Sequence, residues 1–169
     1  MSRGNRKQGI LAHVELVVFD IDGVLTDGRL YFGSRGEALK VFHVRDGHGM
    51  KLLMHAGLEI AIISGRRSTA VSARMRELGV RRVVQGCGDK VAAMGAIARN
   101  ARVPLSRCAC LVDDTPDLPL MASVGFAAAV ADAHPLVRRA AAWISRSKGG
   151  HGAAREFCDA ILLARSGSG

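Results

Sequence analysis

The stretch VVFDIDGVLTDG, residues 17–28, begins as a buried strand and ends in carboxylates. Its first three residues are apolar and favour a strand, and Asp20 and Asp22 follow two positions apart. Burying ionised carboxylates is costly unless something compensates their charge. The stretch therefore predicts a strand that ends at a functional site, for which other segments must supply the compensation.

The composition is that of one globular unit with a basic surface. The chain has 169 residues, of which 49% are hydrophobic, and this length supports a sizeable core but is short for two domains. We therefore predict a single domain over residues 1–169. The formal net charge of +9 favours an anionic partner or substrate. We expect no nucleic-acid partner, because the basic residues occur in scattered short pairs without interleaved aromatic residues.

The cysteines and the short length of the apolar runs indicate a cytoplasmic protein. Cys108 and Cys110 lack a second pair of metal ligands and are interpreted as core thiols rather than as part of a disulfide scaffold. No apolar run approaches the roughly 18 residues that span a bilayer, so no membrane partner is expected. The basic segment 1–12 leads into no signal-peptide core and is expected to be a loose tail.

Strand-like and helix-like runs alternate along most of the chain. The strand-like runs are residues 14–19, 59–63, 81–84, 109–112 and 126–130, and the helix-like runs are 69–78, 90–101 and 116–124. This alternation predicts βαβ crossovers and a mainly parallel sheet covered on both faces. The exception is 29–44, where two apolar runs around a polar turn predict a β-hairpin. The predicted fold class is α/β, a Rossmann-like three-layer fold with a β-hairpin flap.

Polar side chains collect at the predicted strand ends. They are Asp20 and Asp22 after the first strand, Ser64 after the second, Lys90 after the third, and Asp113, Asp114 and Asp117 after the fourth. Ligands of open α/β sheets bind beyond the carboxyl ends of the strands, and converging carboxylates there suit a hard cation such as Mg²⁺. Duty in turns and helix caps explains single residues such as Thr115, but not the whole set.

The segments DIDGVLT, IISGR, the segment around Lys90 and DDTPD, in this order, resemble the four motifs of the haloacid dehalogenase-like phosphotransferases. The resemblance implies that Asp20 is a nucleophile that forms an aspartyl-phosphate and that Asp22 is the general acid and base. It implies a Mg²⁺ site made by the carboxylates of Asp20 and Asp113 and the backbone carbonyl of Asp22. The remaining catalytic residues would hold the phosphoryl oxygens or orient water, and these are Ser64, Lys90 and Asp117.

The spacing of the motifs leaves no room for a cap domain, which usually sets the substrate in this superfamily. Between Asp22 and Ser64 there is space only for the hairpin, one helix and one strand. Among capless enzymes, the chain from about residue 14 to 163 resembles the octulosonate 8-phosphate phosphatases. Those enzymes release phosphate and an eight-carbon sugar acid used in lipopolysaccharide synthesis, so the implied partner is an acidic sugar phosphate.

The same resemblance implies a substrate pocket rich in cations. Besides Asp22 and Lys90, its lining would be His43, Val44, Arg45, Asp46, Gly47, Lys51, Arg66 and Arg74. Such cations suit a substrate with a carboxylate and a phosphate, and the arginine fork pairs bidentately with a carboxylate. Two positions depart from the family pattern: His43 replaces a more usual asparagine, and Val112 replaces the glycine that usually precedes the metal-site aspartate.

Three other interpretations stay open. A phosphatase for a nine-carbon ulosonic acid 9-phosphate, such as a sialic-acid relative, would carry nearly identical motifs. A non-catalytic oligomerisation module, of the kind appended to sugar-nucleotide transferases, would not need the intact acidic set. A nucleic-acid end-processing phosphatase would use the positive charge, but the sequence lacks a basic run.

A capless site is open to water, whereas closure strengthens the electrostatics of phosphoryl transfer. The hairpin 29–44 is more apolar than a lone hairpin needs, and the glycine-rich run 148–152 opens a C-terminal tail and helix over 148–169. Related enzymes are homotetramers whose hairpins pack together and whose C-terminal segments reach a neighbour's site. The resemblance therefore implies a homotetramer with each active site completed by a neighbouring subunit. Ending the chain after Ser147 is expected to leave the core folded.

Overall fold

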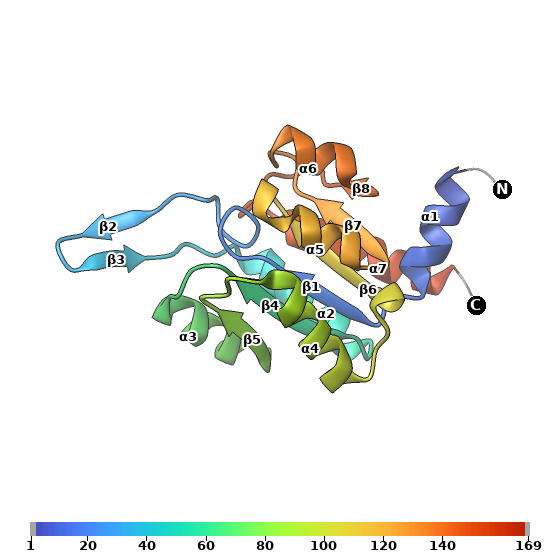
Figure 1. The fold of residues 1–169 in the computed structure, drawn as a ribbon, viewed down its shortest axis with the longest axis horizontal. Coiled ribbons are helices and arrows are strands. Elements are labelled where there is room, and N and C mark those ends of the chain that lie inside the picture. Colours follow the sequence, from blue (N-terminus) through green and yellow to red (C-terminus); the bar gives the residue numbers. More distant parts are fainter. Residues whose placement is uncertain (1–2, 168–169) are drawn as a thin grey trace.

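A six-stranded sheet forms the centre of the computed structural model, which describes residues 3–167; residues 1, 2, 168 and 169 of the expected tails lie outside the described residues. The strand order is β5-β4-β1-β6-β7-β8, and every neighbouring pair is parallel (Figure 1). The strands are β1 (Leu16–Phe19), β4 (Glu59–Ser64), β5 (Arg82–Gln85), β6 (Cys108–Val112), β7 (Phe126–Ala129) and β8 (Trp143–Ile144). The predicted mainly parallel sheet is confirmed.

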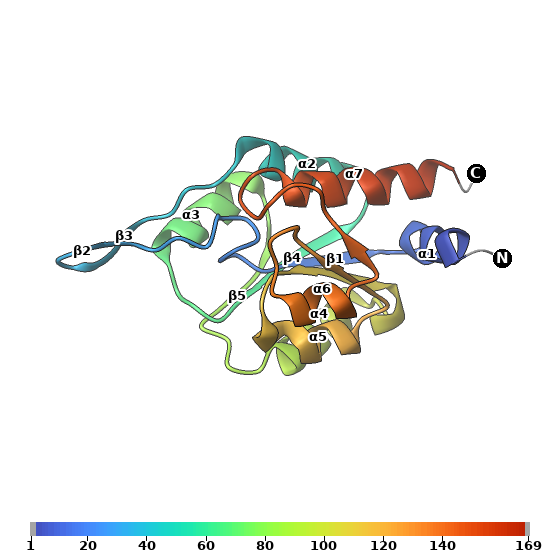
Figure 2. The ribbon, with the colours of Figure 1, turned by 90° about the horizontal axis from the view of Figure 1, so that it is seen from above.

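Helices cover both faces of this sheet, which confirms the three-layer α/β fold (Figure 2). On one face lie α2 (Val44–His55), α3 (Thr69–Leu78) and α7 (Ala153–Ser166), and on the other lie α4 (Lys90–Ala101), α5 (Leu118–Ser123) and α6 (Pro135–Ala140). Two short 3₁₀ turns, η1 (Leu105–Arg107) and η2 (Thr115–Asp117), flank β6. Among the described residues, no helix combines the length and the apolarity that crossing a membrane requires.

The central strands explain why this sequence folds as a covered sheet. All residues of β1 and β6 are buried, and strands buried on both faces appear as continuous apolar runs such as LVVF and CACLV. The crossover helices have clear local signals: Asp89 caps α4 by accepting a hydrogen bond from the Ala92 N–H, and α3 ends at Gly79 with a left-handed φ of 81°. These local signals explain why the predicted bounds of α3 and α4 match the structure.

The flap projects from one end of the sheet as an antiparallel pair, β2 (Tyr31–Gly33) and β3 (Gly36–Leu39) (Figure 1). The predicted hairpin is confirmed, although its strands are shorter than 29–44. Phe32 is 63% exposed, whereas Phe42 packs against the core. Between β1 and β4 the chain forms only this flap and α2, so the predicted absence of a cap domain is confirmed for that segment.

The N-terminal segment is more ordered than expected. Residues 3–12 of the expected loose tail form α1 (Arg3–Ala12), which lies beside α7, and Leu11 is only 5% exposed. The basic composition of this segment gave no sign of a helix, because the helix is stabilised by packing Leu11 against the core. At the C-terminal end, the structure argues against a folded core without the residues after Ser147. Helix α7 packs along α2 and buries Phe157 and Ile161, so its loss would uncover the core.

Candidate active site

The predicted polar residues meet in a cavity of about 280 Å³ at the carboxyl ends of the central strands. Its lining comprises Asp20, Asp22, Gly65, Cys87, Gly88, Lys90, Asp113, Asp114, Pro116 and Asp117. Ser64 ends β4 next to this lining and is buried, and its hydroxyl accepts a 3.4 Å hydrogen bond from the Arg66 N–H. Sheet topology therefore gathers residues that are far apart in the chain.

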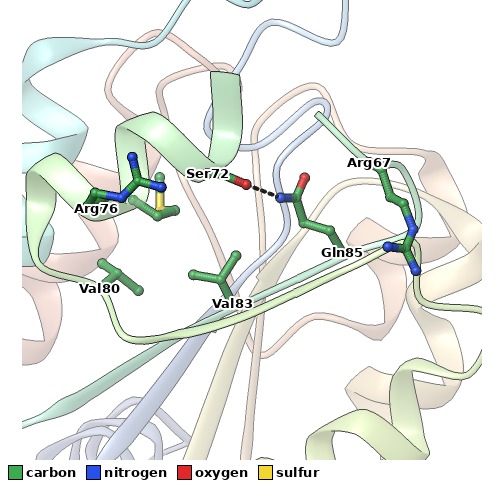
Figure 3. Close-up of a pocket in the computed structure, with 7 residues that line it drawn as sticks. Arg67, Ser72, Arg76, Val80, Val83 and Gln85 are labelled. Atoms are coloured by element: carbon green, nitrogen blue, oxygen red, sulfur yellow. Dashed lines mark hydrogen bonds between the residues drawn. The ribbon is translucent and has the colours of Figure 1, made fainter. Parts of the chain in front are cut away.

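Larger hollows occur elsewhere on the surface. One of about 480 Å³ lies between α3 and β5, with Arg67 and Arg76 at its sides and a 2.9 Å hydrogen bond from Gln85 to Ser72 across it (Figure 3). None of the described residues that line it is acidic. The chemistry of the side chains, rather than cavity size, identifies the smaller cavity as the candidate active site.

Lys90 links two of the aspartates at the centre of the cavity. Its Nζ donates to Asp20 Oδ2 at 2.7 Å and to Asp117 Oδ1 at 2.5 Å. Burial alone would lower the pKa of Lys90, but the charges of the two aspartates outweigh burial and raise it. Lys90 is therefore a fixed cation, held by its place at the start of α4.

The aspartates form a cluster that calls for a further cation. Carboxylate oxygens of Asp20, Asp113 and Asp117 lie within 4.8 Å of one another. Burial, and next the charges of Asp20, Asp117 and Asp114, raises the pKa of Asp113 to about 8. Burial also raises the pKa of Asp20 to about 6, although Lys90 opposes the shift. One lysine does not neutralise three crowded carboxylates, and oxygen donors so close together fit Mg²⁺.

This crowding predicts that the metal-free protein loses stability as pH rises. Asp113 and Asp20 have folded-state pKa values of about 8 and about 6, whereas the ordinary value is 3.8. Between the ordinary value and these raised values, the folded chain binds more protons than the unfolded chain. In chelator, the midpoint temperature of thermal unfolding should therefore decrease as the pH is raised from about 5 to about 8. Added Mg²⁺ should raise this temperature more at the higher pH. Thermal unfolding with and without Mg²⁺ measures both effects. In Asp113→Asn the slope should flatten; an unchanged slope would contradict the assignment.

The Asp22 side chain is held from the flap side. Its Oδ1 accepts a hydrogen bond from Lys40 Nζ, and its Oδ2 lies 3.8 Å from Arg66 Nε. The predicted proximity of Arg66 to the site is thus observed. Lys40 was missed by the sequence analysis, and its signal, a lysine in an apolar hairpin segment, is weak without knowledge of the fold.

The HVRDG run opens α2 and is not among the described residues that line the cavity. His43 is the N-cap of the helix, and its Nδ1 accepts a hydrogen bond from the Arg45 N–H at 3.2 Å. Val44 is 75% exposed and Arg45 is also exposed, whereas Lys51, later in the same helix, is half-buried. Within one chain, these residues therefore do not line the cavity that contains Asp20.

Asp46, Gly47 and Arg74 have packing contacts within the chain. Asp46 is 2% exposed and its Oδ1 accepts from the Arg155 N–H at 2.8 Å, while its Oδ2 has no hydrogen-bond partner in the described structure. Burial raises the pKa of Asp46, and the Arg155 N–H partly opposes this. A Cβ on Gly47 would lie 2.5 Å from Arg74 Nη2. The family resemblance implied that these residues line the substrate pocket; within one chain they join α2 to α7 and α3.

The glycine-rich run also has a different contact from the one expected. Gly150 N–H donates to the Val24 carbonyl at 2.8 Å, and Gly149 N–H donates to Asp132 Oδ1 at 2.9 Å. A Cβ on Gly149 would lie 1.7 Å from the Gly23 carbonyl oxygen. Close backbone approach is therefore the reason for these glycines, and the partner is the loop after Asp22 in the same chain.

The fold and the cavity define a haloacid dehalogenase-like hydrolase. A family model with that description matches residues 81–157. A similar protein that aligns with most of this chain establishes that the chain belongs to the family. It is 44% identical over 154 residues, covering 91% of this chain and 82% of the relative, to 3-deoxy-D-manno-octulosonate 8-phosphate phosphatase KdsC of Yersinia pestis.

Solved structures agree with this relationship. The crystal structure of the Yersinia pestis phosphatase superposes with a TM-score of 0.92 at 42% identity, covering 95% of this chain and 86% of the other. The Moraxella catarrhalis phosphatase, solved with a magnesium ion, a phosphate ion and a KDO molecule, has a TM-score of 0.92 at 36% identity, covering 96% and 93%. A Mg²⁺ site at the aspartates is consistent with the ion in that relative.

Proposed function

We propose that this chain is a magnesium-dependent phosphatase that hydrolyses 3-deoxy-D-manno-octulosonate 8-phosphate to the free sugar acid and phosphate, in lipopolysaccharide synthesis. The observation that carries the proposal is the cavity itself, in which Lys90 joins Asp20 and Asp117 beside Asp113. Similarity to the KdsC phosphatases supplies the substrate. Phosphoryl transfer depends mainly on positioning and charge neutralisation, which this arrangement supports.

The first half-reaction transfers the phosphoryl group to the protein. A carboxylate oxygen of Asp20 attacks phosphorus and forms an O–P bond, while the bond from phosphorus to the sugar oxygen breaks. Asp22 gives its proton to the departing alkoxide. Lys90 and the hydroxyl of Ser64 hold the phosphoryl oxygens, and Lys90 offsets repulsion between the phosphate and Asp20. Asp117 keeps Lys90 in place through their 2.5 Å contact.

The second half-reaction releases phosphate. Asp22, now ionised, takes a proton from water as the water oxygen attacks phosphorus, and the bond to Asp20 breaks. Mg²⁺, when held by the carboxylates of Asp20 and Asp113 and the backbone carbonyl of Asp22, supplies positive charge to the phosphoryl oxygens. Each half-reaction begins from the protonation state of Asp22 that the other leaves.

The sugar acid meets cations beyond the phosphoryl site. Arg66, beside Asp22, is the cation of the same chain best placed for the substrate. The residues that would reach a substrate across a subunit boundary are the exposed or half-buried ones, His43, Val44, Arg45, Lys51 and Arg74. The buried Asp46 and Gly47 would hold this surface against α7 and α3. The proposed assembly is a homotetramer in which flaps pack together, which is supported by the exposed apolar Leu30, Phe32, Leu39 and Val41. Light scattering tests it, and an active monomer would refute it.

The proposed location is the cytoplasm. All four cysteines are unpaired, and three of them, Cys108, Cys110 and Cys158, are buried. Burial raises the pKa of the Cys108 thiol to about 11 and that of the Cys110 thiol to about 12, which keeps both thiols protonated and inert. Such thiols suit a reducing compartment.

A panel of phosphate esters tests the substrate assignment. With Mg²⁺ present, phosphate release should be fastest, by kcat/KM, with 3-deoxy-D-manno-octulosonate 8-phosphate, because the similar phosphatases are named for that ester. Sialic-type 9-phosphates and a 5′-phosphorylated DNA end are the competitors in the panel. Faster turnover of a 9-phosphate would transfer the assignment to a nine-carbon substrate, and no turnover of any ester would favour a non-catalytic module.

A further inference from the structure

We infer that Lys40, in the segment that follows the flap, is a positioning residue that aims the Asp22 carboxylate at the leaving oxygen. The inference rests on the proposed role of Asp22 as general acid. It concerns a residue outside the four sequence motifs and outside the predicted substrate pocket. Its basis is the ion-pair network between the flap and the cavity.

The Lys40 ammonium group is buried between two carboxylates. Its Nζ donates to Asp22 Oδ1 and lies 3.2 Å from Glu37 Oε2. The Lys40 side chain is 2% exposed, whereas that of Asp22 is 21% exposed. Lysine is almost never fully buried unless it is paired, and removing one partner of a buried pair leaves the other charge uncompensated. This contact is therefore not one of the weak surface ion pairs.

Arg66 completes the network from the other side. Its Nε lies 3.8 Å from Asp22 Oδ2, its Nη2 donates to Glu37 Oε2 at 3.4 Å, and its guanidinium carbon stands 6.0 Å from the centre of the Phe32 ring. The Arg66 side chain is 42% exposed, so it is free to turn toward a substrate. Lys40 has no such freedom, and it alone of the two makes a short contact with Asp22.

This geometry matters because a general acid works only within hydrogen-bond reach of the leaving oxygen. The Asp22 carboxylate has one oxygen held by Lys40, which leaves the other to face the departing group. Without Lys40, the carboxylate can rotate, and the protonation of a poor leaving group suffers. An alkoxide leaving group needs that proton, whereas a p-nitrophenolate hardly does. Loss of positioning should therefore depend on the leaving group.

The experiment compares kcat/KM for the sugar phosphate and for p-nitrophenyl phosphate, since kcat/KM reports the steps up to release of the first product. Lys40→Met should lower the value for the sugar phosphate by about 10- to 100-fold, a part of the 10²- to 10⁴-fold that general acid catalysis contributes. The value for the aryl ester should change by less than about threefold. Lys40→Arg keeps the charge and should restore most of the loss.

Two further variants separate the possible causes. Glu37→Gln weakens the attachment of the flap through Lys40 and Arg66 but leaves Asp22 its own contacts, so it should affect both esters alike. Asp22→Asn should show the same dependence on the leaving group as Lys40→Met, only larger. If Asp22→Asn shows none, the proposed role of Asp22 fails. If Asp22→Asn shows it and a folded Lys40→Met does not, the inference about Lys40 is overturned.

Discussion

Asp20→Asn should abolish phosphate release, lowering kcat by at least about a thousandfold, in the range that loss of a catalytic nucleophile costs. An amide oxygen does not attack phosphorus as a carboxylate does. The Asn side chain can still accept the hydrogen bond from the Ile21 N–H, so the local backbone should stay in place. Initial rates with the sugar phosphate at saturating Mg²⁺ measure the effect.

The same substitution should not destabilise the metal-free protein. It removes one of three crowded carboxylates, while Lys90 keeps its contact with Asp117. The thermal midpoint in chelator should therefore equal or exceed that of the wild type at neutral pH. Asp27→Asn, on the same loop but outside the cavity lining, is the matched control and should stay active. Activity in Asp20→Asn, with deamidation excluded by mass spectrometry, would refute the assignment of Asp20 as the nucleophile.

Gly149→Ala should weaken the metal site from a distance. The added methyl group would lie 1.7 Å from the Gly23 carbonyl oxygen, and backbone forms both sides of this contact. Gly23 in turn packs closely on the metal-site aspartate, because a Cβ on Gly23 itself would lie 2.0 Å from Asp113 Oδ2. Displacement of the loop therefore reaches Asp113. Overpacking of this kind costs about 1–3 kcal/mol of folding free energy.

Calorimetric titration with Mg²⁺ and thermal unfolding measure this effect. In Gly149→Ala, Mg²⁺ affinity should fall about tenfold or more, which corresponds to about 1.4 kcal/mol, together with activity. Gly152→Ala is the matched control: its φ of 99° makes alanine strained, but no atom lies within 4 Å of the added methyl group. It should lose stability while keeping Mg²⁺ affinity. Equal affinities in the two variants would contradict the link between Gly149 and Asp113.

Local sequence patterns were sufficient for the layout of the site. The apolar run that ends at Asp20, the helix cap that precedes Lys90 and the run that ends at Asp113 are each legible within a few residues. Parallel strands then bring their carboxyl ends to one edge, so a general rule of sheet topology converts separate segments into one site. This is why the acid cluster could be predicted before any contact was known.

Elements without a strong local pattern were missed. Strand β8 has only Trp143 and Ile144, and it exists because it pairs with β7 at the edge of the sheet. Helix α1 carries its basic residues in its first half, and its place beside α7 depends on tertiary packing. Short or basic segments carry too little apolar pattern to be assigned from sequence, because their stability comes from neighbours that are distant in the chain.

Sequence patterns were enough for the α/β class, the order of the main strands and helices, and the residue types at the strand ends, because periodicity, caps and strand ends are local properties. Three contacts became visible only in the folded chain: Lys40 holds Asp22, Gly149 packs on Gly23, and Asp46 joins α2 to α7. The physical reason is that these contacts depend on the spatial approach of separate segments. Backbone proximity and the burial of a charge are properties of the folded chain and leave no periodic signal in its sequence.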